Sequence, residues 1–269
     1  MSREITLEDF QKYYPYAPTA LAIKECVRLN ALRGLECPSP ILDVGCGDGL
    51  FASLAFSGAD VWGIDIDGNE GRHAQASKAY SHVILADVTK ARLPSSFFAS
   101  CVANCSLEHV PDIDAAARGI LAALKPGGIF CTFLPNRDWA DALLSATLLR
   151  RLGLESLANT ITEGINSIFK HRHLEDAAGW RRIFENAGFE VTRVDPIGTT
   201  ASTRAFEAFL LPSLAGRLNK ELTGRWTNSP ALRRAGALPV YALVSALLNT
   251  SRDQRLTAEF MLVARKPAR

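Results

Sequence analysis

Ile41-Leu-Asp-Val-Gly-Cys-Gly-Asp-Gly49 places a short apolar run directly before three glycines at alternate positions. Glycine accepts positive φ and has no Cβ, so this stretch predicts a buried strand that bends sharply and leaves room for a ligand. Dinucleotide-binding folds have GxGxxG, and Leu50 stands where the third glycine would be, which argues against NAD. Asp65 follows Gly45 by twenty residues, where a carboxylate can accept both hydroxyls of a ribose. The spacing predicts a nucleoside cofactor without a pyrophosphate.

Around this stretch, short β-branched runs alternate with stretches of helical period. Strands are predicted at 41–44, 61–64, 83–86, 101–104, 129–134, 189–194 and 258–264, and helices at 50–57, 68–80, 113–124 and 174–186. Asp112 is placed to cap the third of these helices, and Lys125-Pro-Gly-Gly128 predicts a turn. This alternation predicts an α/β fold with a doubly wound, seven-stranded, mostly parallel sheet.

Three pieces fall outside the alternating pattern. Residues 1–37 are predicted to form an N-terminal helical lid, and residues 38–269 the main domain, with helical cap insertions at 136–172 and 199–255. The first insertion carries apolar residues at helical spacing, which predicts one apolar helix face: Leu154, Leu157, Ala158, Ile161, Ile165 and Ile168.

Composition narrows the class of protein. The 269 residues are 48% hydrophobic and 22% charged, which excludes a long disordered chain, and the net charge of +2 is too small for whole-surface attraction to nucleic acid. The six cysteines form no CxxC pair and several lie in apolar runs, so we expect reduced thiols and a cytoplasmic protein. The first ten residues resemble no targeting signal, and no apolar run reaches the ~20 residues that cross a bilayer. Residues 236–248 come nearest and predict a buried or interfacial helix.

Five motifs occur in an order that resembles the class I S-adenosylmethionine-dependent methyltransferases. They are Val44-Gly-Cys-Gly-Asp-Gly49, Gly63-Ile-Asp65, Ala86-Asp87, Ser106-Leu-Glu-His-Val110 and Leu124-Lys-Pro-Gly-Gly128. The similarity is greatest to the broad group of small-molecule methyltransferases that includes quinone and natural-product enzymes, and it covers residues 41–134 best. It implies a Rossmann-like methyltransferase fold, S-adenosyl-L-methionine as cofactor and a small-molecule acceptor.

The resemblance also implies roles for individual residues. The three glycines line the methionine and ribose, Asp65 holds the ribose hydroxyls, an acid such as Asp87 meets the adenine amine, and Asp43 braces the glycine loop. Tyr14 would fold over the cofactor as part of a lid, although packing of the two neighbouring tyrosines against the core explains it equally well. The full set implied for the cofactor is Tyr14, Asp43, Gly45, Cys46, Gly47, Gly49, Asp65, Ile66, Asp87, Val88, Asn104 and Cys105.

Methyl transfer from a sulfonium needs collinear placement above all, and orientation alone is worth roughly 7–11 kcal/mol. An alcohol acceptor still gains from a base, for which histidine suits neutral pH. His109, in the Glu-His-Val motif, and His171 and His173, at the end of the first insertion, are the candidates. The alternatives are a loop-fixing role for His109 and a solvated helix start for the other two. His-x-His without nearby acids or cysteines is a poor metal signature, so no metal is predicted.

The second insertion, 199–255, is basic and partly apolar. It holds eight basic residues (Arg204, Arg217, Lys220, Arg225, Arg233, Arg234, Arg252 and Arg255) and three acidic ones (Glu207, Glu221 and Asp253). Apolar stretches bordered by arginine suit an amphipathic acceptor with an anionic group, or peripheral contact with a membrane of anionic lipid. Our hypothesis is a hydrophobic or amphipathic acceptor that is methylated at oxygen. The alternative is a lid or dimer contact, so both a monomer and a homodimer fit the sequence.

Two other functions compete with methyl transfer. A nicotinamide-dependent reductase of the short-chain type needs Tyr followed four residues later by Lys, and no tyrosine here satisfies this. A non-catalytic protein that keeps the cofactor site for regulation or assembly would have a closed acceptor cleft.

Overall fold

The computed structural model describes residues 4–249 and 257–268. They form two compact units, each assembled from three stretches of the chain. The sheet unit comprises Arg33–Arg137, Lys170–Pro196 and Glu259–Arg269, and the helical unit comprises Met1–Leu32, Asp138–Phe169 and Ile197–Ala258. Of the charges counted in the second insertion, Arg252, Asp253 and Arg255 lie outside the described residues.

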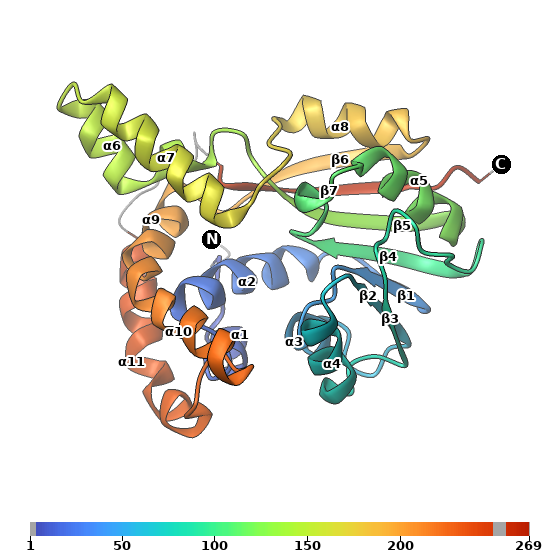
Figure 1. The fold of residues 1–269 in the computed structure, drawn as a ribbon, viewed down its shortest axis with the longest axis horizontal. Coiled ribbons are helices and arrows are strands. Elements are labelled where there is room, and N and C mark those ends of the chain that lie inside the picture. Colours follow the sequence, from blue (N-terminus) through green and yellow to red (C-terminus); the bar gives the residue numbers. More distant parts are fainter. Residues whose placement is uncertain (1–3, 250–256, 269) are drawn as a thin grey trace. The chain divides into compact units, whose positions relative to one another are not determined.

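The sheet unit contains one seven-stranded sheet with the order β3-β2-β1-β4-β5-β7-β6 (Figure 1). The strands are β1 (Ile41–Val44), β2 (Val61–Asp65), β3 (His82–Leu85), β4 (Phe98–Asn104), β5 (Leu124–Pro135), β6 (Glu190–Ile197) and β7 (Glu259–Arg265). The first five pair in parallel, whereas β7 is antiparallel to β5. The predicted doubly wound, mostly parallel sheet is confirmed.

Helices cover both faces of this sheet. Figure 1 draws α3 (Leu50–Ala55) and α4 (Gly68–Ser77) on one face, and α5 (Ile113–Ala123) and α8 (Ala177–Asn186) on the other. Large side chains between the sheet and α8 are completely buried, among them Phe130, Trp180 and Phe184. The indole of Trp180 donates to the carbonyl oxygen of Pro135 at 2.9 Å, so its one polar atom is satisfied.

Most predicted elements of the sheet unit are confirmed within a few residues, and the differences have local causes. Asp112 caps α5 by accepting from the amide of Ala115, as predicted. The helix predicted at 174–186 begins only at Ala177, because Asp176 is its N-cap. The turn predicted at 125–128 is wrong. This segment belongs to β5, and Gly127 (φ +74°) lies in a bulge between the pairs Phe98–Leu124 and Ser100–Ile129.

The helical unit has no strand besides the end of β6 among its described residues. Its α-helices are α1 (Leu7–Tyr13), α2 (Thr19–Leu32), α6 (Leu144–Arg151), α7 (Glu155–Phe169), α9 (Thr200–Ala208), α10 (Leu210–Thr223) and α11 (Pro230–Leu248), with a short 3-10 helix, η2, at Trp139–Ala142. Helix α2 contacts α1, α9 and α10, and α11 contacts α1 and α9. The 3-10 helix η2 contacts α6, α7 and α9, which joins the middle stretch to the others. Residues from all three sequence stretches therefore share one helical unit.

Helix α11 covers the segment 236–248, where the sequence predicted a buried or interfacial helix, and the structure contradicts only the buried alternative. It begins at Pro230, and only Ala237, Tyr241 and Val244 are buried. Among the described residues it is the one helix long and apolar enough to cross a membrane, by length and composition only. Cores of soluble proteins pass the same test, but only 17% of its apolar window is buried.

All six cysteines lie in the described residues and are free thiols. Burial raises the pKa of the Cys37 thiol to about 11 and raises the pKa values of Cys46, Cys101 and Cys131 further. Since the thiolate is the nucleophile, we expect iodoacetamide at pH 8 to alkylate Cys37 about two orders of magnitude more slowly than N-acetylcysteine in the same tube. Mass spectrometry of the tryptic peptide measures the rate, and equal rates would contradict the assigned burial.

Candidate functional site

The alternating glycines form a left-handed bend at the carboxyl end of β1. Gly45, Gly47 and Gly49 have φ values of +74°, +54° and +82°, a region that disfavours every residue with a Cβ. A Cβ on Gly45 would collide with Ser106, and one on Gly49 would lie 2.6 Å from the hydroxyl of Ser77. A Cβ on Gly47 would meet no protein atom within 4 Å. The bend is thus closed by protein at its ends and open at Gly47.

Asp65 faces this bend, as its spacing predicted. One carboxylate oxygen accepts from the amide of Gly47 at 2.8 Å, and the other accepts from the amide of Asp67 at 2.8 Å. The carboxylate therefore ties the end of β2 to the middle of the glycine bend. Ile66, the next residue, is 74% exposed, although a large apolar side chain favours burial. Asp65 and Ile66 place a polar and an apolar group beside the open position at Gly47.

Asp43 and Tyr80 brace the bend from inside the sheet unit. The carboxylate of Asp43 is 2% exposed and accepts from the hydroxyl of Tyr80 at 2.7 Å, while that hydroxyl also lies 3.2 Å from the carbonyl oxygen of Cys46. Burial, and then the charge of Asp43, raise the pKa of Tyr80 far above its usual value, so the phenol stays a donor. Tyr80 was not predicted from the sequence. Its position just after a helix gives no sign that its ring reaches back to β1.

Cys46 fills the space beneath the bend. Its side chain is 7% exposed, and a Cβ on Gly63 of β2 would lie 2.9 Å from its sulfur. Its amide donates to the carbonyl oxygen of Ile64 at 3.1 Å. Cys46 therefore supports the bend by packing, and its contact with a cofactor stays a prediction.

Asp87 and Val88 follow β3, next to the end of β2, where the amide of Ala86 donates to the carbonyl oxygen of Asp65 at 2.9 Å. One oxygen of Asp87 accepts from both the hydroxyl and the amide of Thr89, and these bonds hold the pKa of Asp87 below its usual range. Val88 is 9% exposed. Asp87 is ionised at neutral pH and lies at the same edge of the sheet as Asp65.

The end of β4 supplies Asn104 and Cys105. Cys105 has a φ of +46°, which is uncommon for a residue with a side chain and marks a locally strained backbone. The next residue, Ser106, donates its hydroxyl to the carbonyl oxygen of Val44 at 2.6 Å. This bond joins the end of β4 to the start of the glycine bend, so both segments occupy one edge of the sheet.

Two of the three candidate histidines lie together, and the third is held elsewhere. His109 ends the 3-10 helix η1 (Leu107–His109), and its ring stacks on that of His171 with centroids 5.6 Å apart. Nε2 of His173 lies 2.9 Å from the carbonyl oxygen of Val110 and can only donate there. His171 and His173 lie in the loop before α8 and do not begin that helix, and both are half-buried, while their role in catalysis stays a prediction.

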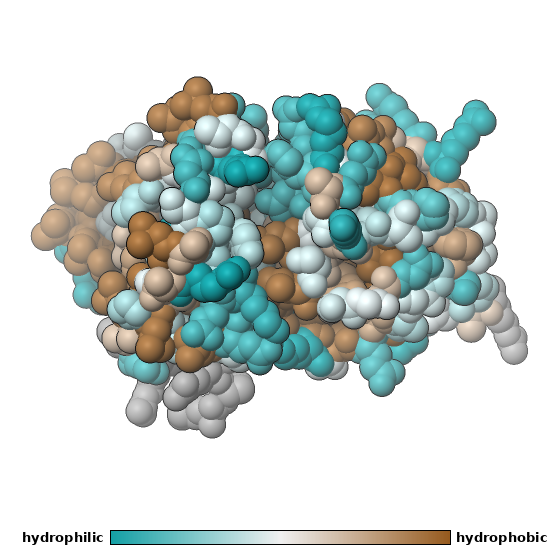
Figure 2. Space-filling view, turned by 90° about the horizontal axis from the view of Figure 1, so that it is seen from below, coloured by the Kyte–Doolittle hydropathy of each residue, from teal (hydrophilic) through white to brown (hydrophobic). Residues whose placement is uncertain are grey.

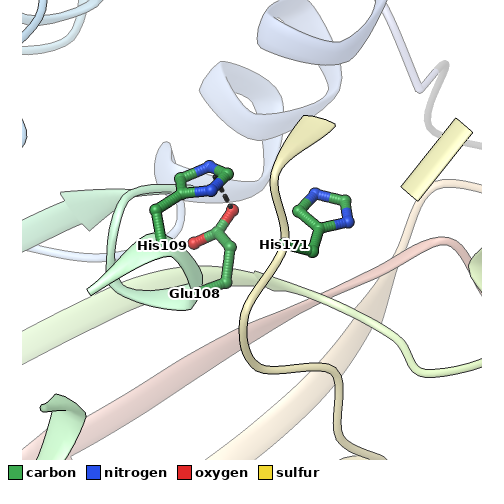
Figure 3. A group of neighbouring side chains, drawn as sticks. All are labelled: Glu108, His109 and His171. Atoms are coloured by element: carbon green, nitrogen blue, oxygen red, sulfur yellow. Dashed lines mark ion pairs between the residues drawn. The ribbon is translucent and has the colours of Figure 1, made fainter. Parts of the chain in front are cut away.

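Glu108 joins this pair of histidines (Figure 3). Its side chain is 1% exposed, and one oxygen lies 3.7 Å from Nε2 of His109. One atom each of Glu108, His109 and His171 all lie within 4.8 Å of one another. The prediction of no metal assumed that no acid stood near the histidines, and this assumption is wrong. Spacing in the sequence did not reveal the cluster, because 62 positions separate His109 from His171.

Tyr14 lies in the helical unit. Tyr14 is 8% exposed, and its ring stacks on that of Phe10 with centroids 5.0 Å apart. The guanidinium carbon of Arg233 lies over the Tyr14 ring, 3.9 Å from its centroid. Arg233 also donates to the carbonyl oxygens of Tyr14 and Ala17, so it fastens α11 to the loop between α1 and α2. Packing within the helical unit explains Tyr14, and its contact with a cofactor stays a prediction.

Comparison with known proteins gives one family. A model described as a methyltransferase domain matches residues 19–194. The chain is 32% identical over 176 residues to a ubiquinone biosynthesis O-methyltransferase of Paraburkholderia phymatum, covering 62% of this chain and 71% of that protein. It is 32% identical over 169 residues to the enzyme of the same name from Pseudomonas putida, covering 60% of this chain and 67% of that protein.

Solved structures share the fold at lower identity. The [4+2]-cyclase SpnF aligns with a TM-score of 0.57 at 19% identity, over 92% of this chain and 82% of that chain. Phosphoethanolamine N-methyltransferase 2 of Haemonchus contortus aligns with a TM-score of 0.54 at 17% identity, over 98% of this chain and 60% of that chain. A cyclase and a methyltransferase therefore share this architecture, which shows the fold but not the reaction.

Proposed function

Because the chain belongs to the methyltransferase-domain family and is an S-adenosylmethionine-dependent methyltransferase of small molecules, we propose that it methylates an oxygen of a hydrophobic or amphipathic acceptor. The observation that carries methyl transfer is the glycine bend, open at Gly47 and faced by Asp65, where the methyl donor is expected. The name of the two O-methyltransferase relatives supports oxygen as the methylated atom.

The residues around the bend fit an adenosyl sulfonium. Asp65 has acceptor capacity left for ribose hydroxyls, because each of its oxygens accepts one backbone amide and a carboxylate oxygen has two lone pairs. The exposed side chain of Ile66 offers an apolar surface to an adenine ring, and Asp87 an acceptor for its amine. Asn104 and Cys105, at the end of β4, would line the methionine part.

The cofactor supplies a methyl group on a sulfonium, a good leaving group, so the protein has mainly to place the acceptor. The glycine bend and the end of β4 would hold the methyl donor in a fixed position. Orientation of two reactants in this way is worth roughly 7–11 kcal/mol. Asp43 and Tyr80 contribute by keeping the bend in place. The acceptor oxygen must also lose its proton, and the cluster of His109, His171 and Glu108 is the group that we propose takes part in this loss. His173, bonded to Val110, acts instead by holding its loop.

The proposed function is tested with the purified protein and methyl-labelled S-adenosylmethionine. Calorimetry with S-adenosylhomocysteine should show binding at one site. Incubation with alkylated phenols and catechols should give labelled products, and with matched anilines or thiols should give none. Labelled amine or thioether products with no labelled ether would contradict oxygen as the methylated atom. No binding of S-adenosylhomocysteine would contradict the assignment of the bend.

We also propose that the helical unit contacts the surface of a membrane that contains anionic lipid. Fourteen of the sixteen large apolar side chains that are exposed in the described residues belong to this unit. On α10, which has no buried residue, Leu211, Leu214, Leu218 and Leu222 recur at helical spacing and are 44–77% exposed. Figure 2 shows hydrophobic side chains at the surface on its left, where Figure 1 draws these helices.

Charge supports a lipid surface over a second copy of the chain. The described part of the second insertion, residues 199–249, has six basic residues against two acidic ones. Among the basic residues, Arg217, Lys220 and Arg225 lie on or just after α10. A second copy would bring like charges together, whereas anionic headgroups would complement them.

Flotation with vesicles tests the membrane proposal. The protein should float with vesicles of phosphatidylcholine and phosphatidylglycerol at low salt, and less with phosphatidylcholine alone. Because burying a leucine is worth about 1.5–3 kcal/mol, Leu218→Asp or Leu222→Asp should each weaken flotation by about 10-fold or more. Leu85→Gln, an exposed leucine of the sheet unit, is the control. A protein that sediments as a dimer and does not float would overturn the proposal.

A further inference from the structure

Glu108, His109 and His171 form a side-chain cluster that cofactor binding does not explain. Figure 3 shows the carboxylate of Glu108 and the rings of His109 and His171 side by side. One nitrogen or oxygen atom from each lies within 4.8 Å of the other two, and the separation between Glu108 and Nε2 of His109 is 3.7 Å. The latter is longer than a hydrogen bond and short enough for two ligands of one cation, which at about 2.0–2.2 Å each lie up to ~4 Å apart. A pair near the 4.8 Å limit would have to close by less than about 1 Å when the ion binds.

Backbone contacts hold the two segments of the cluster together. The carbonyl oxygen of Glu108 accepts from the amides of Arg172 and His173, at 2.9 and 3.1 Å. Nε2 of His173 donates to the carbonyl oxygen of Val110. These bonds anchor the two residues that follow His171 in the chain. Lys170, the residue before it, has a φ of +55°. The loop therefore presents His171 in a fixed position next to η1.

The tautomer of His109 suits a metal ligand. Its Nδ1 lies 3.2 Å from the carbonyl oxygen of Lys170, which can only accept, so Nδ1 carries the proton. In the neutral ring the lone pair is on Nε2, the atom that lies 3.7 Å from the Glu108 carboxylate, so a cation bound there would replace the proton of this ion pair. A backbone carbonyl that orients the other ring nitrogen in this way is the usual outer partner of a metal-binding histidine.

We propose that Glu108, His109 and His171 bind one first-row divalent cation, with Zn²⁺ preferred to Mg²⁺. The buried carboxylate of Glu108 already has the ring of His109 beside it, and two imidazoles with one carboxylate are a ligand set of catalytic zinc, which leaves a coordination position open. Imidazole ligands favour zinc and its neighbours, whereas magnesium favours oxygen ligands.

This inference rests on the proposed function for what the cation does. An acceptor hydroxyl at the open position would release its proton to solvent more readily, as a zinc-bound water does. The oxygen lone pair then forms the bond to the methyl carbon, and the breaking carbon–sulfur bond leaves its electron pair on sulfur. The products are the methyl ether, S-adenosylhomocysteine and one proton. Glu108 lies three positions after Cys105 in the sequence, close to the end of β4, where the methyl donor is expected.

Cation binding is tested without any acceptor, on the full chain treated with a chelator and then dialysed. Calorimetry with Zn²⁺ and absorption titration with Co²⁺ should show one site, with the strong visible bands of low-coordinate Co²⁺. Loss of even an outer partner costs about 10–100-fold in metal affinity, so His171→Asn and Glu108→Gln should lower it by more than about 100-fold. His73→Asn, on α4, is the matched control and should bind as the parent does.

Binding of S-adenosylhomocysteine separates the possible results. The binding constant for S-adenosylhomocysteine should be the same in His171→Asn, in the chelated protein and in the parent. Unchanged binding also shows that His171→Asn is folded, so the test stands even if Glu108→Gln does not fold. If the protein binds one equivalent of Co²⁺ but transfers no methyl group, the cation site stands and the proposed function is rejected. Methyl transfer by a chelated protein that binds no Co²⁺, or equal Co²⁺ binding by His171→Asn, would overturn the cation site and leave His109 as a metal-free base.

Discussion

Asp65→Ala is expected to weaken the binding of S-adenosylhomocysteine by about 10- to 100-fold, because a hydrogen bond to a charged group is worth about 1.5–3 kcal/mol. The substitution removes the acceptor for the ribose hydroxyls and also the bond that holds the amide of Gly47. Calorimetry on the parent and the variant measures the change directly.

The control for Asp65 is another acid of the sheet unit that accepts a backbone amide. Asp112→Ala removes the cap of α5 and should cost about 1 kcal/mol of folding stability while leaving the binding constant unchanged. If Asp65→Ala binds S-adenosylhomocysteine as tightly as the parent, the carboxylate has no role in binding the ribose, and the fit of the bend to the cofactor fails with it.

Alanine at Gly45 and alanine at Gly47 are expected to fail in different ways. At Gly45 the new Cβ collides with Ser106 and the backbone is left-handed, so we expect a loss of about 2–5 kcal/mol in the free energy of unfolding. At Gly47 the Cβ meets no protein atom, so the loss should be limited to about 1–2 kcal/mol of backbone strain. There the Cβ would instead occupy the space proposed for the cofactor.

Urea unfolding and calorimetry together separate these two effects. Gly47→Ala should remain folded and bind S-adenosylhomocysteine at least tenfold more weakly, which is a change of about 1.4 kcal/mol. Gly34→Ala is the control, since a Cβ there meets nothing and its φ is not in the left-handed region. A Gly47→Ala protein that binds as the parent does would mean that the open side of the bend is not where the ligand lies.

The sequence was informative where local chemistry determines local structure. Alternating glycines after a β-branched run determine the bend, and the interval to Asp65 reflects one strand–helix–strand unit, so both could be predicted. Asp112 could be identified as a cap because its carboxylate bonds an amide only three residues away. The five ordered motifs then identified the family and its cofactor.

The parts that could not be predicted depend on long-range contacts. Tyr80 reaches Asp43 across 37 positions, and no local pattern marks a buried tyrosine donor. The cluster of Glu108, His109 and His171 forms only when the loop before α8 meets η1. The helical unit is likewise built from three stretches of chain, so residues that looked like separate insertions share one body.

The position of β7 has a consequence for synthesis on the ribosome. This strand is made after all the others, yet it lies between β5 and β6 and pairs with β5 from Ile129 to Pro135. Until residues 259–265 emerge, β6 has no neighbour and one edge of β5 stays open to mispairing. The nascent chain thus completes its sheet in a late step, by inserting a strand into a gap and not by adding one at the rim.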